Sequence, residues 1–446
     1  MLEPILFGVL AGCIAGVIPG IGVFVALLIS YPLLINLDII TILIFYLALS
    51  STTQYIGSIP ATFFAVPGEN SSVPALYEGN AMFKKGEGAL AISGAALGSI
   101  LGSFVVLLFF IIAGPLMSQL KYFITSYVQF IFICLTIFIF ILSSKGKWYV
   151  AALLAAVGYY IGSIGCSDYY GCFGPEFLMS NPDVQIGIPL LPFLSGVFVF
   201  PLLLKVYDNY TLDRAPQNKI LLKDHLNYFK NHIPSSLRGS LVAFAIAYLP
   251  GIGQTVCSNL SYRLEMYLNK NYKLGDYKCL VAAETSNNSA ILINLIPLFL
   301  LGIPTGASEV LLFEIASSKA FWFVENFTYE LFIYTLVPTI IIANLLAFSV
   351  AWPFAKSLLF LQRVNQKYIN IFCFILLVII NAYLGSLTWS TYYYLSVFFL
   401  CLPIGYLLRK QDVLPMIFTF ILAGYITSLS ISLPDLITID LRLLFG

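Results

Sequence analysis

Charged residues are scarce in this sequence. Lys, Arg, Asp and Glu make up 10% of the 446 residues, whereas a soluble globular domain contains about 25%. Hydrophobic residues make up 60%, and the mean hydropathy is +0.93. Apolar stretches of about 20 residues, the length that spans a bilayer as a helix, recur along the whole chain. These features exclude an ordinary soluble protein and predict an all-α integral membrane protein in contact with the lipid bilayer.

Other scarcities exclude further classes of function. The net charge of +1 gives no reason to expect nucleic acid as a partner. The two histidines, His225 and His232, lie in a polar loop, which argues against a histidine proton relay or a His-ligated metal site. The first residues, MLEPILFGVLAG, have neither a basic region nor a small-residue cleavage site, so we expect them to stay on the mature protein.

Cysteine usage is informative at one place. Six of the eight cysteines stand singly in apolar segments, where cysteine usually acts as a small hydrophobic residue. Cys166 and Cys172 lie close together in the polar stretch IGCSDYYGCFGPE. Their spacing allows a disulfide, and the sequence leaves this bridge open.

Two apolar segments contain the same helix-breaking motif. Residues 17–22 read VIPGIG, and residues 248–253 read YLPGIG. Proline and glycine interrupt helices, so a membrane-length segment with both at its middle needs an explanation. Each PGIG segment, 4–34 and 239–262, could cross the membrane once or form a re-entrant hairpin that enters and leaves on one side.

Hydropathy predicts ten full crossings besides the two PGIG segments. They lie at about 37–66, 88–113, 122–143, 148–165, 187–204, 279–304, 331–354, 366–386, 388–408 and 412–432.

The distribution of basic residues discriminates between the two readings of the second PGIG segment. With both segments as hairpins and the N-terminus outside, 19 of the 22 basic residues are cytoplasmic, and only Lys121, Lys319 and Arg442 are outside. If the second segment crosses once, the split becomes 12 against 10. The count favours a hairpin there. The first segment has no basic residue before it, so its hairpin is predicted by analogy, and a crossing stays open.

The hairpins and crossings together predict an internal repeat. One hairpin plus about five crossings is followed by the same arrangement, and an odd number of crossings gives the two units opposite orientations. We expect transmembrane repeats at 1–204 and 239–446, joined by a cytoplasmic linker at 205–238. Two inverted-topology repeats are typical of secondary transporters, whose broken helices meet near the midplane and bind the substrate there.

Polar residues gather at corresponding places in the two halves, at predicted membrane depth. The first group is Ser50, Ser51, Thr52, Thr53, Gln54, Gly57 and Ser58, followed by Pro67, Gly68, Glu69, Asn70, Ser71 and Ser72. The second group is Glu284, Thr285, Ser286, Asn287, Asn288 and Ser289, followed by Pro304, Thr305, Gly306 and Ser308. Small residues also serve helix packing, which is how we interpret Gly94, Gly98 and Gly102. Buried amides need several partners, which favours a functional role for Asn287 and Asn288.

These groups suit the binding of an anion together with a small cation. Broken helices expose N–H groups that can bind a carboxylate, and freed carbonyls with Asn, Ser and Thr oxygens suit Na⁺. We predict four helix-breaking prolines: Pro19, Pro67, Pro250 and Pro304. The predicted substrate-binding residues are Gly20, Gly22, Thr52, Thr53, Gly57, Ser58, Asn70, Ser71, Ser72, Gly251, Gly253, Asn287, Asn288, Thr305 and Gly306. The predicted ion-coupling residues are Glu69, Glu284, Asn287 and Asn288, with Na⁺ as the one metal considered and no other cofactor expected.

Five ordered blocks resemble the large membrane subunit of the tripartite tricarboxylate transporter family. They are GVIPGIG (16–22), TQYIGSIPATFFAVPGENSSVPALYEGNAMFKKGEGA (53–89), LPGIGQTVCSNLSYRLE (249–265), AAETSNNSA (282–290) and LGIPTGASEVLL (301–312). The resemblance implies an inverted-repeat permease of a bacterial inner membrane that imports carboxylates with a small membrane subunit and a periplasmic binding protein. The chain departs from the family pattern at Ile56, at 77–79 and at Thr305, which bears on the substrate more than on the fold.

The leading hypothesis is therefore a Na⁺- or H⁺-coupled secondary transporter that imports a di- or tricarboxylate, and not an enzyme. An intramembrane enzyme acting on a lipid-linked substrate is the alternative from another class, with Glu69 and Glu284 as its candidate acids. A passive anion channel is a third. The sequence leaves the substrate, the coupling ion and a homo-oligomeric state open.

Overall fold

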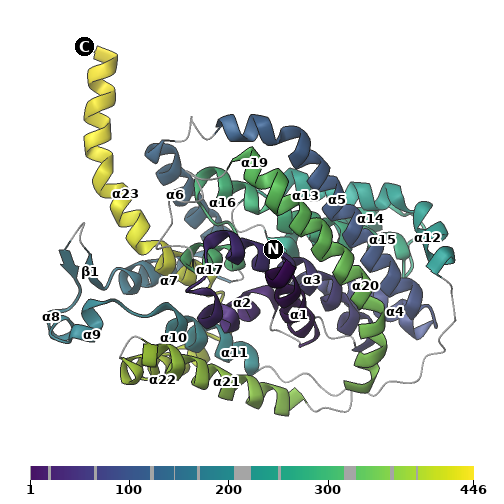
Figure 1. Ribbon diagram of the computed structural model, residues 1–446, viewed down its shortest axis with the longest axis horizontal. Coiled ribbons are helices and arrows are strands. Elements are labelled where there is room, and N and C mark those ends of the chain that lie inside the picture. The colour runs from purple at the N-terminus through teal and green to yellow at the C-terminus, as the bar shows by residue number, and fades with distance from the viewer. Residues whose placement is uncertain are drawn as a thin grey trace. The chain divides into compact units, whose positions relative to one another are not determined.

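The computed structural model describes residues 2–18, 22–64, 68–120, 125–144, 146–167, 171–204, 222–249, 253–315, 328–361, 366–387 and 390–445. Five predicted site positions, Pro19, Gly20, Pro67, Pro250 and Gly251, lie outside these residues. The described chain is almost entirely helical (Figure 1), with one short two-stranded hairpin. It divides into two compact units, which are described separately below.

Unit 1 combines Met1–Gln119, Val206–Leu300 and Pro304–Ile371. Its helices from the first half of the chain are α1 (Leu2–Val17), α2 (Gly22–Leu34), α3 (Ile39–Phe64), η1 (Asn70–Ser72), η2 (Ala75–Gly79), α4 (Asn80–Lys84) and α5 (Gly88–Leu120). Those from the second half are α12 (Leu222–Lys230), α13 (Ile233–Ile246), α14 (Gln254–Leu268), α15 (Tyr277–Ile293), α16 (Leu295–Leu301), α17 (Ala307–Ile315), α19 (Tyr329–Leu331), η6 (Phe332–Leu336) and α20 (Val337–Leu361). Unit 1 therefore brings together both predicted repeats, whose boundaries remain a prediction.

Unit 2 combines Leu120–Lys205, Leu301–Ile303 and Phe372–Gly446. Its elements are α6 (Ser126–Ser143), α7 (Trp148–Gly162), β1 (Gly165–Ser167), β2 (Gly171–Phe173), α8 (Glu176–Met179), α9 (Pro182–Gln185), α10 (Leu190–Leu194), η4 (Ser195–Val199), α11 (Phe200–Leu203), most of α21 (Gln366–Leu387), α22 (Thr391–Leu408) and α23 (Leu414–Phe445). Strands β1 and β2 are antiparallel, with Cys166 opposite Cys172. These two cysteines form a disulfide, so the bridge that the sequence left open is present.

The helices are those of a membrane protein. Within the described residues, four are long and apolar enough to cross a bilayer: Ile39–Phe64, Gly88–Leu116, Tyr329–Ala351 and Thr391–Leu408. Each of the ten predicted crossings coincides with helical structure in the described residues, although 279–304 is interrupted at Asn294 and after Leu301. The interruption at Asn294 lies three residues before Pro297, which cannot donate the backbone hydrogen bond that would continue α15.

Helix α1 packs tightly against α3, and the two helices run parallel. Gly8 contacts the Phe45–Leu49 stretch of α3, Gly12 contacts Leu49–Thr53, and Gly16 contacts Thr53–Gly57. The chain must therefore return along α1 before α3 begins, and α2 supplies that return, so α1 and α2 form a helical hairpin. Figure 1 shows the three helices side by side in purple.

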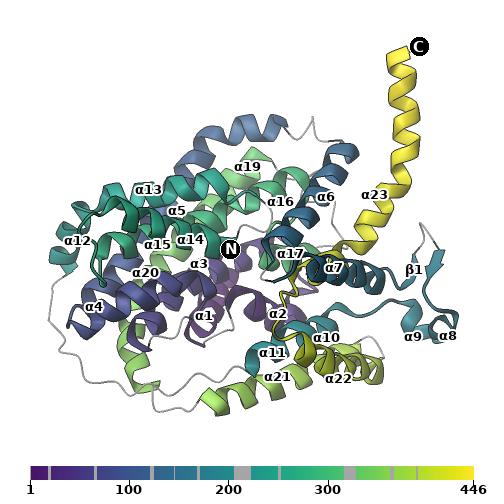
Figure 2. The same cartoon turned by 180° about the vertical axis from the view of Figure 1, so that it is seen from behind.

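The second PGIG segment has the same geometry. Gly239 of α13 contacts Ala282 of α15, and further along both helices the Ala247 carbonyl lies beside the Asn294 amide, so α13 runs parallel to α15. Arg238 of α13 forms an ion pair with Glu265 of α14 (Nε–Oε1 2.5 Å), which joins the two ends of this second hairpin. Figure 2 shows α13, α14 and α15 together. In each half of unit 1, two helices therefore precede a polar helix and pack against it.

A glycine ladder brings α5 against α15. Gly94 contacts Tyr277, Gly98 contacts Val281 and Thr285, and Gly102 contacts Thr285 and Ser289. This contact confirms the predicted packing role of the three glycines. It also fixes one wall of the polar segment of α15, whose residues Tyr277–Ile293 are nearly all buried.

Candidate functional site

Residues 68–72, which follow α3, lie at the centre of the candidate site, between α1 and α14. Gly68 packs on the carbonyl of Gly16, at the C-terminal end of α1, and its N–H donates to the Gly57 carbonyl (3.3 Å). From the other side, the Ser258 hydroxyl of α14 donates to the Ser71 carbonyl (2.8 Å). Residues 68–72 therefore contact one hairpin from each half of the chain.

Glu69 binds the start of α2. Its Oε2 accepts a hydrogen bond from the Val23 N–H at 3.1 Å, in the first turn of the helix, where the helix dipole stabilises a negative charge. Gly22 has φ +55°, in the left-handed region, and a Cβ there would lie 2.8 Å from Glu69 Oε2. A side chain at position 22 would thus strain the backbone and displace the carboxyl group.

The Gln54 amide joins the two halves of the chain. Its Oε1 accepts from the Ser71 hydroxyl (2.9 Å) and from Asn287 Nδ2 of α15 (2.6 Å), a residue 233 positions away. Gln54 and Asn287 are both fully buried. Sequence reasoning included Gln54 in the polar stretch of α3 but did not select it, because the stretch gives no sign of which residue contacts the other half.

The bonded pair of Gln54 and Asn287 has buried polar atoms without a hydrogen-bond partner in the described structure. They are Gln54 Nε2 and Asn287 Oδ1. Asn287 lies near enough to the Glu284 carboxyl group to interact with it, and neither Glu284 oxygen has a regular hydrogen bond to a described residue. Ser72 Oγ, beside Gly57, is also without a described partner. More than nine in ten buried polar groups in proteins are satisfied, so these atoms indicate a place where a polar ligand or water completes the bonding.

Other predicted site residues make local contacts. Thr53 and Ser58 donate to carbonyls of their own helix, at Leu49 (2.8 Å) and Tyr55 (3.0 Å). Asn288 donates to Ser99 of α5 (2.7 Å). Thr305 donates to the Asn294 carbonyl (3.3 Å), across the break between α15 and α17.

Three further predicted positions are Gly57, inside α3, and Asn70 and Gly253, at the starts of helices. Gly57 lies beside Ser72 and the Glu69 backbone. Gly253 precedes α14, and a Cβ added to it would have no described atom within 4 Å. Asn70 is the first residue of η1, and its side chain is outside the described structure.

A second buried carboxyl group, Glu309, was missed by sequence reasoning. Its Oε1 accepts from the Tyr46 hydroxyl (2.9 Å), and its Oε2 accepts from Ser308 (3.3 Å). Glu309 folds over Gly306, where a Cβ would collide with the carboxyl group. It also interacts electrostatically with Glu69. The sequence could have predicted this site, because Glu309 is an acidic residue within an apolar segment, which is the feature by which we chose Glu284.

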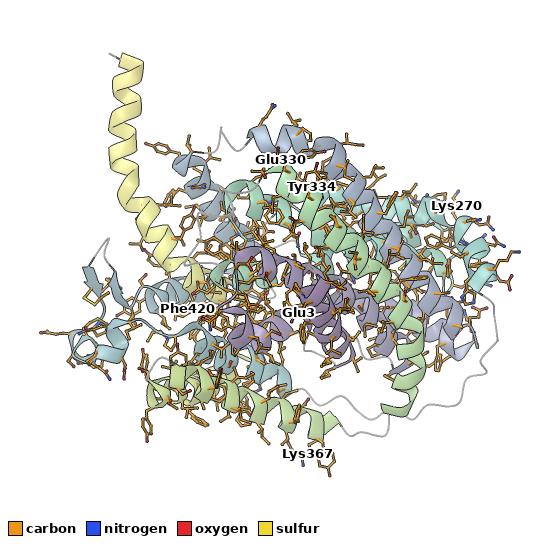
Figure 3. The ribbon with its side chains drawn as sticks, viewed as in Figure 1. Glu3, Lys270, Glu330, Tyr334, Lys367 and Phe420 are labelled. Atoms are coloured by element: carbon orange, nitrogen blue, oxygen red, sulfur yellow. A yellow bond between two sulfur atoms is a disulfide. The ribbon has the colours of Figure 1, made fainter. Side chains whose placement is uncertain are left out.

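Glu78 is a third buried carboxyl group, and it is fully paired. Its Oε1 accepts from the hydroxyls of Tyr262 (3.0 Å) and Tyr272 (2.6 Å), and its Oε2 accepts from the N–H groups of Gly275 and Asp276 (both 2.6 Å). Burial and the bond to Glu78 raise the pKa of Tyr272 to about 12, so its hydroxyl remains a donor. By contrast, Glu3, Lys270, Glu330 and Lys367, labelled in Figure 3, are exposed.

The fold and the candidate site define an all-α membrane protein whose polar residues converge at breaks in buried helices. The family model of the tripartite tricarboxylate transporter TctA family matches residues 2–419, and the chain belongs to this family. The family is one of transporters, which argues against an enzyme.

Two uncharacterised relatives extend the comparison. A 52.8 kDa protein of Agrobacterium vitis, from the TAR-I ttuC' 3' region, is 29% identical over 304 residues, covering 67% of this chain and 60% of the relative. The match thus spans less than two thirds of that relative's length. A protein of Methanocaldococcus jannaschii is 25% identical over 416 residues, 92% of this chain and 93% of its own. No solved structure matches the chain.

Proposed function

We propose that this protein is a cation-coupled secondary transporter that imports a di- or tricarboxylate, and that the substrate binds where Gln54, residues 68–72 and α15 meet. The observation that carries the proposal is that Gln54 and Asn287, which are hydrogen-bonded to each other across the two halves of the chain, each have a buried polar atom without a described partner. A ligand rich in carboxylate oxygens, bound together with a cation, has the donors and acceptors that these atoms need.

The hairpin geometry supports two inverted repeats with re-entrant hairpins. In each half, the first hairpin helix runs parallel to the polar helix that follows it. Helix α1 ends opposite Gly57, whereas α3 continues to Phe64, about 10 Å further, so α1 stops short of the end of a membrane-length helix. In the sequence, two prolines seven residues apart also follow the polar stretch of each half, at 60 and 67 and at 297 and 304.

The disulfide supports the proposed orientation. Disulfides persist in oxidising compartments, and the hairpin that contains Cys166 and Cys172 lies in a loop that the charge count assigns to the outside. The clusters of basic residues then face the cytoplasm of a multi-pass inner-membrane protein. As a member of a tripartite transporter family, the protein would work with a small membrane subunit and a periplasmic binding protein.

Uptake into liposomes tests the proposal. Purified protein should accumulate labelled citrate only with an inward Na⁺ or H⁺ gradient. Protein-free liposomes are the control for leakage. Uptake that is indifferent to both gradients would contradict the proposal and favour a passive anion channel. Citrate consumed or modified without uptake would favour an intramembrane enzyme.

A further inference from the structure

The side-chain amide of Gln54 has one polar atom without a described hydrogen-bond partner. Its Oε1 is held by Ser71 and Asn287, at 2.9 and 2.6 Å, whereas its Nε2 is without a partner in the described structure although Gln54 is fully buried. The two donors to Oε1 fix the orientation of the amide, so Nε2 must point away from both. A buried amide nitrogen has two N–H groups to donate, and leaving them unpaired is costly.

A hydroxyl group lies on the same side of α3 as this nitrogen. Ser72 is buried beside Gly57, one turn after Gln54 on α3, and its oxygen is unpaired in the part of the chain that the structure describes. An amide N–H and a hydroxyl that can rotate to donate are neutral donors. Such donors suit a carboxylate, which only accepts hydrogen bonds.

In Asn287 it is the amide oxygen, not the nitrogen, that is without a described hydrogen-bond partner. Its Nδ2 is used by Gln54, and its Oδ1 is without a partner in the described chain. Glu284, one turn earlier on α15, is fully buried with neither oxygen in a regular hydrogen bond to a described residue. An amide oxygen and a carboxylate are hard ligands of the kind that bind Na⁺ in broken-helix transporters.

We propose that Gln54 binds a substrate carboxylate through Nε2 while Asn287 binds the coupling cation through Oδ1, and that their direct contact links the two events. This inference rests on the proposed function. A cation at Oδ1 polarises the Asn287 amide and strengthens its Nδ2–H bond to Gln54. That bond holds Gln54 with Nε2 toward the substrate. Because such linkage is reciprocal, the carboxylate must in turn strengthen cation binding by the same factor.

The test measures citrate affinity by thermal shift of the full-length detergent-solubilised protein, in NaCl and in choline chloride. In the wild type, citrate should bind more tightly in NaCl. Gln54→Leu keeps the side-chain size and removes the amide. It should weaken citrate about 10- to 150-fold, the effect of losing a hydrogen bond to a charged group, while NaCl alone still stabilises the protein. Gln129→Leu is the matched control, since Gln129 is a buried glutamine of unit 2 that accepts from Tyr425 (3.1 Å).

Asn287→Asp separates the two roles, because it retains oxygens for a cation but cannot donate to Gln54. It should keep the stabilisation by NaCl and lose the difference in citrate affinity between NaCl and choline chloride. Asn287→Ala should lose both. Size-exclusion profiles check that each variant is folded.

Three outcomes would overturn the inference. One is a Gln54→Leu variant that binds citrate as well as the Gln129→Leu control. Another is an Asn287→Asp variant that keeps the wild-type dependence of citrate binding on NaCl. The third is wild-type citrate binding that is equal in the two salts. Wild-type protein that binds neither citrate nor any other carboxylate would instead reject the proposed function itself, and the inference with it.

Discussion

Glu78 provides the sharpest test of how the two halves of unit 1 are held together. Its carboxylate accepts four hydrogen bonds, and all four donors belong to α14 or to the segment between α14 and α15. Glu78→Ala removes both acceptor oxygens and so all four hydrogen bonds. At about 0.5–1.5 kcal/mol per bond, the loss is about 2–6 kcal/mol. An unfolding entropy of about 2.1 cal/mol/K per residue gives about 0.9 kcal/mol/K for 446 residues. The melting temperature should therefore fall by about 2–6 °C.

A local assay separates this effect from general destabilisation. Cys279 lies in the first turn of α15, three residues after Asp276, and is fully buried. When Glu78 is removed, the loop before α15 loses two anchored N–H groups, and Cys279 should react faster with a maleimide. The assay needs a Cys134→Ser background, because Cys134 is exposed. Tyr272→Phe, which removes one bond, should give a smaller effect, and exposed Glu3→Ala none. Unchanged melting and unchanged labelling of Cys279 in Glu78→Ala would refute the assigned role.

Three further predictions concern packing, capping and pH. Gly12→Ala should lower the free energy of unfolding by about 1–3 kcal/mol, because the new Cβ would lie 2.7 Å from Thr52 Cβ. Thermal melting measures the effect, with Ile14→Ala at an exposed position of the same helix as the control. A Gly12→Ala variant as stable as the wild type would contradict the close contact between α1 and α3. Asp38→Ala removes the bonds to the Thr41 N–H (3.0 Å) and hydroxyl (2.6 Å) at the start of α3. It should cost about 1 kcal/mol in thermal melting, with Asn largely preserving the cap. Burial lowers the pKa of His225 in the folded protein. As the pH falls, His225 is therefore protonated in the unfolded chain at a higher pH than in the folded protein. Stability should fall as the pH drops below about 6.5, and His225→Leu should flatten that part of the melting-temperature profile.

The sequence was sufficient to predict most of the helices. Long apolar stretches without charge have one stable form in lipid, the helix, so hydropathy located nearly every long helix. The proline and glycine motifs predicted where α1 ends and where α14 begins. The glycine spacing at 94, 98 and 102 predicted a packing face, although the partner helix, α15, could be identified only from the structure.

The pairing of polar side chains could not be predicted in the same way. Gln54 meets Asn287 across 233 residues, and Tyr46 meets Glu309 across 263. Such contacts depend on how the helices are rotated and aligned, which a pattern within one helix does not encode. The sequence selected Glu69 and Glu284 as a corresponding pair, whereas the structure gives Glu69 an electrostatic neighbour in Glu309. The ion-coupling roles of Glu69, Glu284, Asn287 and Asn288 remain predictions.

The parallel packing of α1 against α3 has a consequence for biosynthesis. Gly8, Gly12 and Gly16 find their close contacts on α3, between Phe45 and Gly57. While the ribosome is still synthesising α2, helix α1 therefore lacks its packing partner, α3. The N-terminal hairpin can settle only after α3 has entered the membrane beside it, so the first segment to be synthesised must wait for the third before it reaches its native position.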